Sequence, residues 1–532
     1  MNTSIFPMTS PESLGIKTEG ITRFLSECQA AGLELHRFML VRHGLCCAKV
    51  NWAPYSETDW HPMYSFSKSL TATAIGFARQ EGLLSLDERL VDLFPDELLE
   101  EISENLAECT IHHLLCMSCG HETEIQDQGP DWKKTFLAHP FLHKPGTFFK
   151  YNTAGTNMLA AIVKKKTGLQ VLEYLRPRLL DPLGMGQIFC LEMPDEEHTQ
   201  HGGGGMRMQL EDMARFTQFM LQDGVWEGKT LLADWYSARA GVKQMETAGD
   251  SEGHVYDWAM GYGYQCWMGS LPKSYRADGA FGQFGLVFPT LDLCVMINAA
   301  TEQTQTMQDI INQYLLPAVE EDGKNIPVGN NTDAVGENVS GSDTKILPDG
   351  QAFVERRSLM PLSSCRNPRF EQQLEHAVYI PLLEGSPLCS LQQLVGGAGR
   401  FVIEKGEITQ IRFHFEKDKV LLYLTDNGCE KTLAAALNGR FLETEIDGSR
   451  YAATARWRSL RKLEMEIRRM DAMSGVRLIL KFEEDRLNFE ADDTLMTDGG
   501  LGMVDRPLVE FVQVADLKDV NIEVTGNNPG AK

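Results

Sequence analysis

One short stretch constrains this chain more than any other: Tyr64-Ser65-Phe66-Ser67-Lys68, followed by a run of small and apolar residues at 69–78. Such a run is typical of a helix that is packed on several sides. Ser65 and Lys68 are three positions apart, so a helix would place both side chains on one face. Burial of that helix would lower the pKa of Lys68, and a neutral amine can take the proton of a serine hydroxyl. We therefore predict that Ser65 is a nucleophile and that Lys68 is part of its base.

The spacing Ser-x-x-Lys is weak evidence by itself, because it recurs at 270–273, 342–345 and 459–462. The first copy contains Pro272, the second lies in a Gly/Asn/Ser-rich stretch, and the third lies in a basic, strand-like run. None of them begins an apolar helix, so the context selects Ser65. The alternative for Ser65 and Lys68 is a helix N-cap with a solvated lysine.

Length and charge narrow the class of protein. At 532 residues the chain can form two or three domains, and its net charge of −24 argues against nucleic-acid and anionic-membrane partners. The N-terminus lacks the basic end and apolar run of a secretory signal, and no segment approaches the ~20 apolar residues of a membrane span. The twelve cysteines are scattered, which favours reduced thiols. We expect a cytoplasmic protein that acts on a small molecule.

The pattern of strands and helices predicts two domains joined by a linker. In residues 1–320, strand-like segments occur near both ends, with amphipathic helices such as 154–167 and 210–221 between them. Residues 321–352 are polar and rich in Asn, Gly and Asp, which is typical of a linker. In residues 353–524, apolar and polar residues alternate in short runs, which predicts a mainly β domain. Residues 525–532 should be frayed. This second domain could cover or narrow the active-site groove or form a homodimer, and both possibilities stay open.

Five segments also resemble, in the same order along the chain, the serine β-lactamase-like hydrolases. This group includes class C β-lactamases, D-alanyl-D-alanine carboxypeptidases, related esterases and 6-aminohexanoate-dimer hydrolases. The segments are residues 65–68, 110–120, 145–153, 202–221 and 261–283. The resemblance implies an α+β fold of the β-lactamase/transpeptidase type, with an antiparallel sheet, flanking helices and a helical lobe. It covers about the first 320 residues.

The resemblance also implies a mechanism, which is acyl transfer in two steps without metal or cofactor. Ser65 would attack a carbonyl, with Lys68 and Tyr151 as base and proton relay. Tyr151 would need a lowered pKa to act as a base and to activate water, and an adjacent ammonium would supply it. The backbone N–H groups of Ser65 and Phe281 would form the oxyanion hole. The alternative for Tyr151 is a core tyrosine.

The second family motif differs in this chain. The usual Tyr-x-Asn is here Tyr151-Asn152-Thr153, so the amide that normally contacts substrate is displaced to Asn152 or replaced by the Thr153 hydroxyl. Both are predicted to bind substrate. Trp267, close to the last motif, is predicted to line the substrate pocket.

The third motif differs more strongly, because Lys-Thr-Gly or His-x-Gly is replaced by Asp278-Gly279-Ala280. These three residues should border the substrate. A cation would bind a substrate carboxylate, whereas Asp278 would repel it, although Arg276 on the same strand face could compensate in part. We therefore expect a neutral or amine-bearing ester or amide as substrate rather than a β-lactam. Two other functions stay open: an acyltransferase that uses the same acyl-enzyme, and a catalytically silent binding protein of the same fold.

Overall fold

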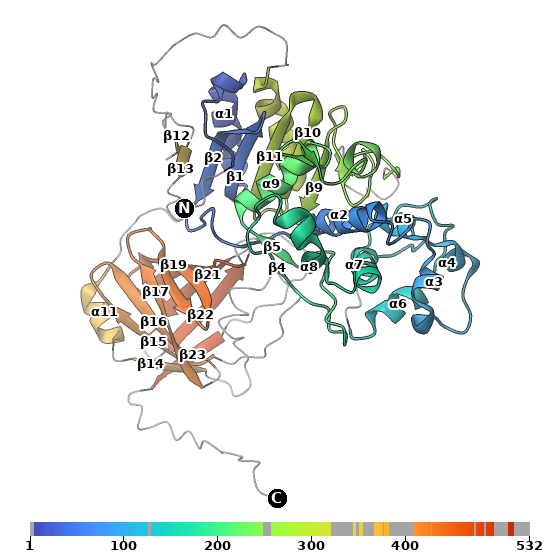
Figure 1. Cartoon of the computed structure of the whole chain (residues 1–532). Helices are drawn as coiled ribbons and strands as arrows, with labels where there is room; N and C mark the ends of the chain where they lie inside the picture. The colour runs from blue at the N-terminus through green and yellow to red at the C-terminus, as the bar shows by residue number, and fades with distance from the viewer. Residues whose placement is uncertain are drawn as a thin grey trace, which may run out of the picture. The chain divides into compact units, whose positions relative to one another are not determined.

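The chain divides into two compact units, Met1–Glu355 and Arg356–Lys532 (Figure 1). The computed structural model describes residues 5–125, 129–247, 257–320, 344–346, 351–354, 366–375, 377–381, 408–426, 428–472, 475–483, 486–493 and 509–514. Within these ranges no helix is long and apolar enough to cross a membrane.

The first unit is built on an eight-stranded sheet that joins its N- and C-terminal parts. β1 pairs on one side with β2 and on the other with β11, about 250 residues later in the chain. All described pairings are antiparallel except that of β13 with β2. The order is β12 (Thr344–Ile346), β13 (Gln351–Val354), β2 (Leu45–Trp52), β1 (Leu35–Arg42), β11 (Leu293–Ala299), β10 (Gln283–Phe288), β9 (Tyr275–Gly279) and β8 (Trp267–Met268).

Both faces of this sheet are covered, which explains why every residue of β1 is buried. Phe38 and Leu40 pack with α1 (Thr18–Ala30), α10 (Thr304–Ile310) and the helical turn Ile311–Leu315. Met39 and Val41 belong to the core on the opposite face, with α2 (Ser67–Gln80) and α9 (Leu210–Leu221). Alternate side chains thus serve two cores, as a sheet between two helical layers requires.

A helical lobe follows α2 in the chain and lies beside the sheet (Figure 1). Twelve consecutive residues of α2, Ser67–Ala78, are buried, as their small and apolar character predicts. α2 packs against α7 (Thr153–Thr167). The other helices of the lobe are α3 (Leu90–Leu93), α4 (Glu104–Glu108), α5 (Ile111–Leu115), α6 (Trp132–Ala138) and α8 (Val171–Leu175). The predicted α+β fold of the β-lactamase/transpeptidase type is confirmed.

The second unit is a ten-stranded sheet, which confirms the predicted mainly β character. Neighbouring strands are antiparallel. One additional parallel pairing joins β17, at one end of the strand order, to β19, near the other end. Aromatic side chains from strands and helix α11 (Pro368–Leu374) fill its core, among them Phe370, Phe413 and Trp457. The order is β17 (Cys429–Ala436), β16 (Lys419–Asp426), β15 (Ile408–Phe415), β14 (Val378–Pro381), β23 (Val509–Val514), β22 (Arg486–Asp493), β21 (Gly475–Phe482), β20 (Lys462–Arg469), β19 (Ser449–Ser459) and β18 (Leu442–Ile446).

The stretch expected to be a linker, residues 321–352, contains strand β12 and the first residues of β13. Both strands belong to the sheet of the first unit. Residues 321–343 and 347–350, and the tail at 525–532, lie outside the described residues.

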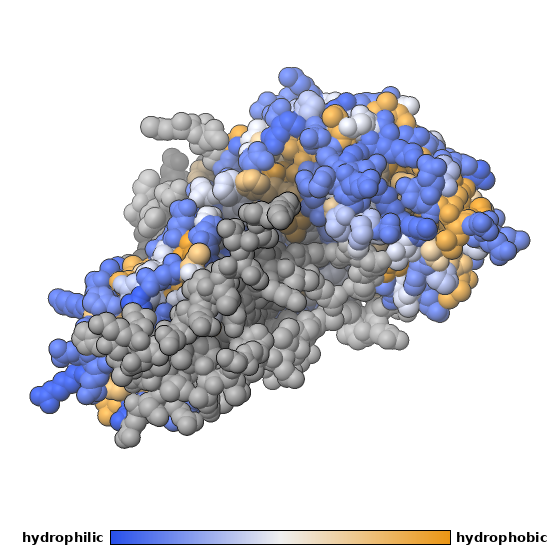
Figure 2. Space-filling model, turned by 90° about the horizontal axis from the view of Figure 1, so that it is seen from below, coloured by the Kyte–Doolittle hydropathy of each residue, from blue (hydrophilic) through white to orange (hydrophobic). Residues whose placement is uncertain are grey.

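Polar residues cover most of the coloured surface in Figure 2, with smaller apolar patches between them. Exposed large apolar side chains of the described residues include Trp60 and Phe189, whose rings meet edge to face at 5.0 Å. A contact between two exposed aromatic side chains is a small apolar patch, and patches of this size are common on protein surfaces and indicate no function by themselves.

Candidate active site

The predicted nucleophile lies in a tight turn rather than in the helix proper. β3 (His61–Pro62) pairs with β5 (Met206–Met208), and the chain then forms a single 3-10 turn at Tyr64–Phe66 before α2 begins. Tyr64 has a φ of 47°, which a residue with a side chain seldom adopts. This turn places half-buried Ser65 at the N-terminal end of α2.

Lys68 is buried and faces three oxygen atoms. Its Nζ lies 2.9 Å from Ser65 Oγ, 3.2 Å from Thr153 Oγ1 and 2.5 Å from the Gly203 carbonyl oxygen. Burial lowers the pKa of Lys68 to about 7, although the Glu124 carboxylate opposes this effect. A neutral amine has two N–H bonds and one lone pair. If the N–H bonds point to Thr153 and Gly203, the lone pair faces the Ser65 hydroxyl.

The glycine-rich turn at 202–205 makes this arrangement possible. A Cβ on Gly203 would lie 2.7 Å from Thr153 Cγ2 and 2.9 Å from the Thr153 carbonyl oxygen. Only glycine therefore allows the Gly203 carbonyl to approach both α7 and Lys68. The four consecutive glycines are typical of a tight turn, but nothing in the sequence indicates that a carbonyl of this turn accepts from Lys68.

Tyr151 completes the group around Ser65. Its hydroxyl is hydrogen-bonded with Ser65, its ring centroid lies 5.0 Å from Lys68 Nζ, and its ring stacks on Trp267 at 5.7 Å. Burial raises the pKa of Tyr151, and the Asp278 and Glu124 carboxylates raise it further. The expected lowering of this pKa is therefore wrong, since the desolvation of the hydroxyl dominates. This raised pKa favours the protonated form of Tyr151.

The turn between β9 and β10 lies against the nucleophile turn. Phe281 in this turn has a φ of 65°, and its ring meets that of Tyr64 edge to face at 5.5 Å. A Cβ on Gly279 would lie 2.1 Å from the Met63 carbonyl oxygen, so only glycine lets β9 come this close. Ala280 is the next residue and begins the turn between β9 and β10. The backbone segments that carry the predicted oxyanion donors, Ser65 and Phe281, are thus neighbours.

The family model for β-lactamase matches residues 44–319, more than half of the chain. The chain belongs to the β-lactamase family. This confirms the family that the motifs predicted.

A curated relative, the 6-aminohexanoate-dimer hydrolase of Paenarthrobacter ureafaciens, is 25% identical over 209 residues, which are 36% of this chain and 53% of the relative. The chain thus spans about half the length of this relative. Among solved structures, a penicillin-binding protein homologue from Caulobacter crescentus is 15% identical, with 55% of this chain and 92% of that chain covered and a TM-score of 0.45. The octameric penicillin-binding protein homologue from Pyrococcus abyssi is 14% identical, with 89% and 97% covered and a TM-score of 0.41.

The altered second motif of this β-lactamase-family chain has a structural explanation. Asn152 is buried, its Oδ1 accepts the Ala154 N–H at the start of α7, and its Nδ2 donates to His121 Nδ1 at 3.4 Å. Asn152 therefore caps a helix, although the sequence suggested a substrate contact. Thr153, predicted to bind substrate as well, is hydrogen-bonded to Lys68.

The altered third motif contains a buried ion pair. Arg276 Nε donates to Asp278 Oδ2 at 2.7 Å, and both side chains are buried. Burial raises the pKa of Asp278 to about 6, against the effect of Arg276. The Arg276 guanidinium also lies over the Trp258 ring at 4.6 Å and donates to the Met268 carbonyl. Arg276 thus neutralises Asp278 within the protein. The sequence suggested that Arg276 could bind a substrate carboxylate, but its contacts are with Asp278, Trp258 and the Met268 carbonyl.

Trp267 belongs to an aromatic cluster beside Tyr151. Its ring meets Tyr262 at 4.8 Å and Trp258 at 4.9 Å, both edge to face. Tyr262 is buried, whereas Trp258 and Trp267 are half-buried. Trp267 and Trp258 can therefore still border a substrate, and Tyr262 is part of the core.

Glu124 is the residue that sequence reasoning missed. It is half-buried, its Oε1 accepts the Thr153 N–H at 3.4 Å, and its charge acts on both Lys68 and Tyr151. No motif marks it, because it lies in an irregular segment after the turn at Gly120. Its proximity to α7 is a property of the fold alone.

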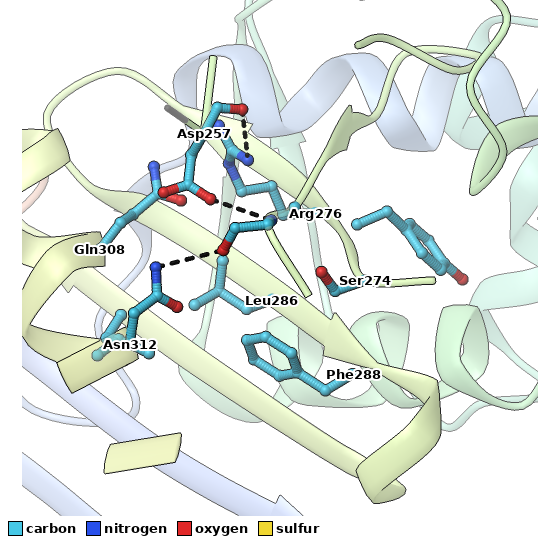
Figure 3. A pocket seen from close by; sticks show the side chains of 11 residues that line it. Asp257, Ser274, Arg276, Leu286, Phe288, Gln308 and Asn312 are labelled. Carbon is cyan, nitrogen blue, oxygen red and sulfur yellow. Dashed lines mark hydrogen bonds between the residues drawn. The ribbon is translucent and has the colours of Figure 1, made fainter. Parts of the chain in front are cut away.

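A separate small pocket lies between β9, β10 and the helical segment at 304–315. Figure 3 shows that Leu286 and Phe288 line it from the sheet and that Gln308 and Asn312 line it from the helical segment. Arg276 lines it from β9, but the residues predicted to be catalytic or to border the substrate do not: Ser65, Lys68, Tyr151, Asn152, Thr153, Trp267, Asp278, Gly279 and Ala280. Across the described parts of the chain, no group of three or more His, Cys, Asp or Glu side chains is placed to hold a metal.

Proposed function

We propose that this β-lactamase-family chain is a serine hydrolase that cleaves a small ester or amide through an acyl-enzyme on Ser65. The observation that carries this proposal is the position of Lys68. Its amine is buried, lies 2.9 Å from Ser65 Oγ and has a pKa of about 7. A surface lysine with an ordinary pKa could not act as a base near neutral pH.

In the first step, neutral Lys68 takes the proton of the Ser65 hydroxyl while Ser65 Oγ attacks the substrate carbonyl. The backbone N–H groups of Ser65 and Phe281 stabilise the negative charge on the carbonyl oxygen. The bond to the leaving group then breaks. Tyr151 passes its proton to the leaving group and receives the proton that Lys68 had taken, so that Lys68 is neutral again.

In the second step, a water molecule attacks the ester formed on Ser65. Lys68 takes a proton from this water, and the bond between Ser65 Oγ and the acyl carbon breaks. The proton returns to Ser65, and the acid is released. We assign the base role in both steps to Lys68, since the raised pKa of Tyr151 favours its protonated form.

The charges near Ser65 favour a neutral or amine-bearing substrate. Glu124 contributes a negative charge, and Arg276 is engaged with Asp278. The name of the curated relative, 6-aminohexanoate-dimer hydrolase, makes linear amides a reasonable first class to screen beside simple esters. A cytoplasmic location is part of this proposal, and the ten free cysteines among the described residues support it.

The proposal is tested by intact mass after exposure to a fluorophosphonate, with Ser65→Ala and Lys68→Ala as variants. Ser270→Ala is the matched control, because Ser270 belongs to another Ser-x-x-Lys pattern. We expect one adduct on the native protein and on Ser270→Ala, and none on the other two. A folded native protein without an adduct would overturn the proposal and favour a silent binding protein.

A further inference from the structure

A buried chain of polar side chains runs from β1 to the turn that carries Phe281. Arg37 Nε donates to Asn298 Oδ1 at 2.9 Å, and Asn298 Nδ2 donates to Gln283 Oε1 at 3.0 Å. Gln283 Nε2 in turn donates to the carbonyl of Ala299 at 2.7 Å and to that of Ala280 at 3.2 Å. All three polar side chains are fully buried. Hydrogen bonds in such an interior are strong and fix the groups that they join.

The bond from Gln283 to the Ala280 carbonyl has a direct consequence for Phe281. The Ala280 carbonyl and the Phe281 N–H belong to the same peptide unit, which is planar, and in a trans peptide they point in opposite directions. A hydrogen bond that holds the carbonyl toward Gln283 therefore directs the Phe281 N–H away from Gln283. The φ of 65° at Phe281 is unfavourable for a residue with a side chain, so the turn needs such a restraint to keep this conformation.

At the other end of this hydrogen-bonded row of side chains, Arg37 contacts the segment that precedes the nucleophile turn. Arg37 Nη1 donates to the Asp59 carbonyl at 2.7 Å, in the segment that leads through β3 to Ser65. Burial lowers the pKa of Arg37 to about 10, so the guanidinium stays charged at neutral pH. One network thus holds the segments on both sides of the predicted oxyanion hole.

We propose that Gln283, supported by Asn298 and Arg37, is a positioning residue that orients the Phe281 N–H toward the oxyanion of the reaction. This inference rests on the proposed hydrolase function. Loss of one whole oxyanion donor lowers kcat by roughly 10²–10³-fold in serine hydrolases. A donor that remains but is misdirected should lower it by at least roughly 10-fold.

Two substitutions test the network. Gln283→Met has a similar length and removes both donations to backbone carbonyls. Asn298→Asp has the same shape and still accepts from Arg37, but it cannot donate to Gln283. The Gln283 amide would then turn its N–H toward the new carboxylate and its oxygen toward the Ala280 carbonyl. The matched control is Gln218→Met, which removes a buried amide from α9.

The readouts are kcat per site labelled by the fluorophosphonate, KM for a neutral ester, and the affinity of a phenylboronic acid, which imitates the tetrahedral intermediate. In Gln283→Met and Asn298→Asp we expect kcat to fall at least 10-fold, KM to stay within about twofold, and the boronic acid to bind more weakly by a similar factor. Gln218→Met should match the native protein in all three.

A merely structural role would give a different pattern. Fewer labelled sites with a native kcat per site would overturn the positioning role, and so would native affinity for the boronic acid. If Gln283→Met does not fold, Asn298→Asp decides by the same criteria. A native protein that neither forms the adduct nor hydrolyses the ester would instead overturn the proposed function itself.

Discussion

The contact between β9 and the nucleophile turn predicts a large effect of one added methyl group. In Gly279→Ala the new Cβ would lie 2.1 Å from the Met63 carbonyl oxygen and 2.8 Å from Gln283 Cβ. A real Cβ essentially never lies within 3.0 Å of such an atom, so the two backbone segments must separate by about 1 Å. These segments carry the N–H groups of Ser65 and Phe281. A misplacement of about 1 Å in an active site can lower the rate by roughly 10²-fold.

We therefore expect kcat/KM of Gly279→Ala for a neutral ester to be about 100-fold below native. Stability should fall by about 1–3 kcal/mol, as for other overpacked sites. Rates are measured spectrophotometrically and divided by the fraction of protein that forms the fluorophosphonate adduct, and urea unfolding gives the stability.

Gly155→Ala is the control, because its Cβ would lie 3.6 Å from the nearest neighbour, Leu114 Cδ2, within helix α7. It should keep native activity and gain up to about 1 kcal/mol, since alanine favours a helix. If Gly279→Ala retains native kcat/KM per labelled site, the close approach of β9 to Met63 does not define the oxyanion hole, and the reasoning fails.

Three further predictions follow from charges in the site and the core. First, kcat/KM should rise with pH through about 7 as Lys68 loses its proton. Glu124→Gln should move this rise to lower pH, because the Glu124 carboxylate favours the ammonium form of Lys68. A pH–rate profile that does not move in this variant would contradict the prediction. Second, Asp278→Asn should lower the free energy of unfolding of the first unit by about 3 kcal/mol, measured in urea, because it leaves the buried charge of Arg276 unpaired. Unchanged stability, with an altered preference between anionic and cationic esters, would favour a substrate contact of Asp278 instead. Third, burial lowers the pKa of His121 to about 3 from 6.5, so the unfolded chain binds a proton that the fold excludes, and stability should fall as the pH drops below 6.5. His121 should contribute about 2 kcal/mol of this loss at pH 5, so the loss in the same urea measurements should be smaller by that amount in His121→Gln, while His113 and His201, whose pKa values burial also lowers, still contribute.

The elements of the fold were predictable where burial is regular along the chain. The small and apolar residues after Lys68 predicted α2, and helical spacing predicted α7 and α9. Hydrophobic periodicity reports burial over ten or more residues, so it defines such elements well. It does not report a single turn. The 3-10 turn at Tyr64–Phe66 depends on one positive φ at a tyrosine, for which the sequence has no signal.

The proximity of Ser65 and Lys68 was predictable from spacing, but the electrostatic state of the groups around them was not. Ser65 and Lys68 are close because three residues separate them on a helical turn. The pKa of Tyr151 depends on how much water reaches its hydroxyl, and desolvation outweighs the nearby amine. Glu124 acts on the same groups from another segment. Desolvation and contacts between distant segments arise from the tertiary fold, which motif spacing does not report.

The charge that a substrate would meet near Ser65 consequently depends on residues other than those that the motif suggested. A free Asp278 in the groove would repel a substrate carboxylate directly, but its pairing with buried Arg276 cancels most of that effect. The Lys68 amine lies against Ser65, and the proposed mechanism needs this amine to be neutral when the reaction begins. In that state Glu124, whose charge acts on Lys68 and Tyr151, contributes a negative charge to the site, so we expect a substrate carboxylate to gain no attraction from Lys68 and to meet repulsion from Glu124. The expected preference for neutral or amine-bearing substrates therefore follows from the protonation state of the base as much as from the altered third motif.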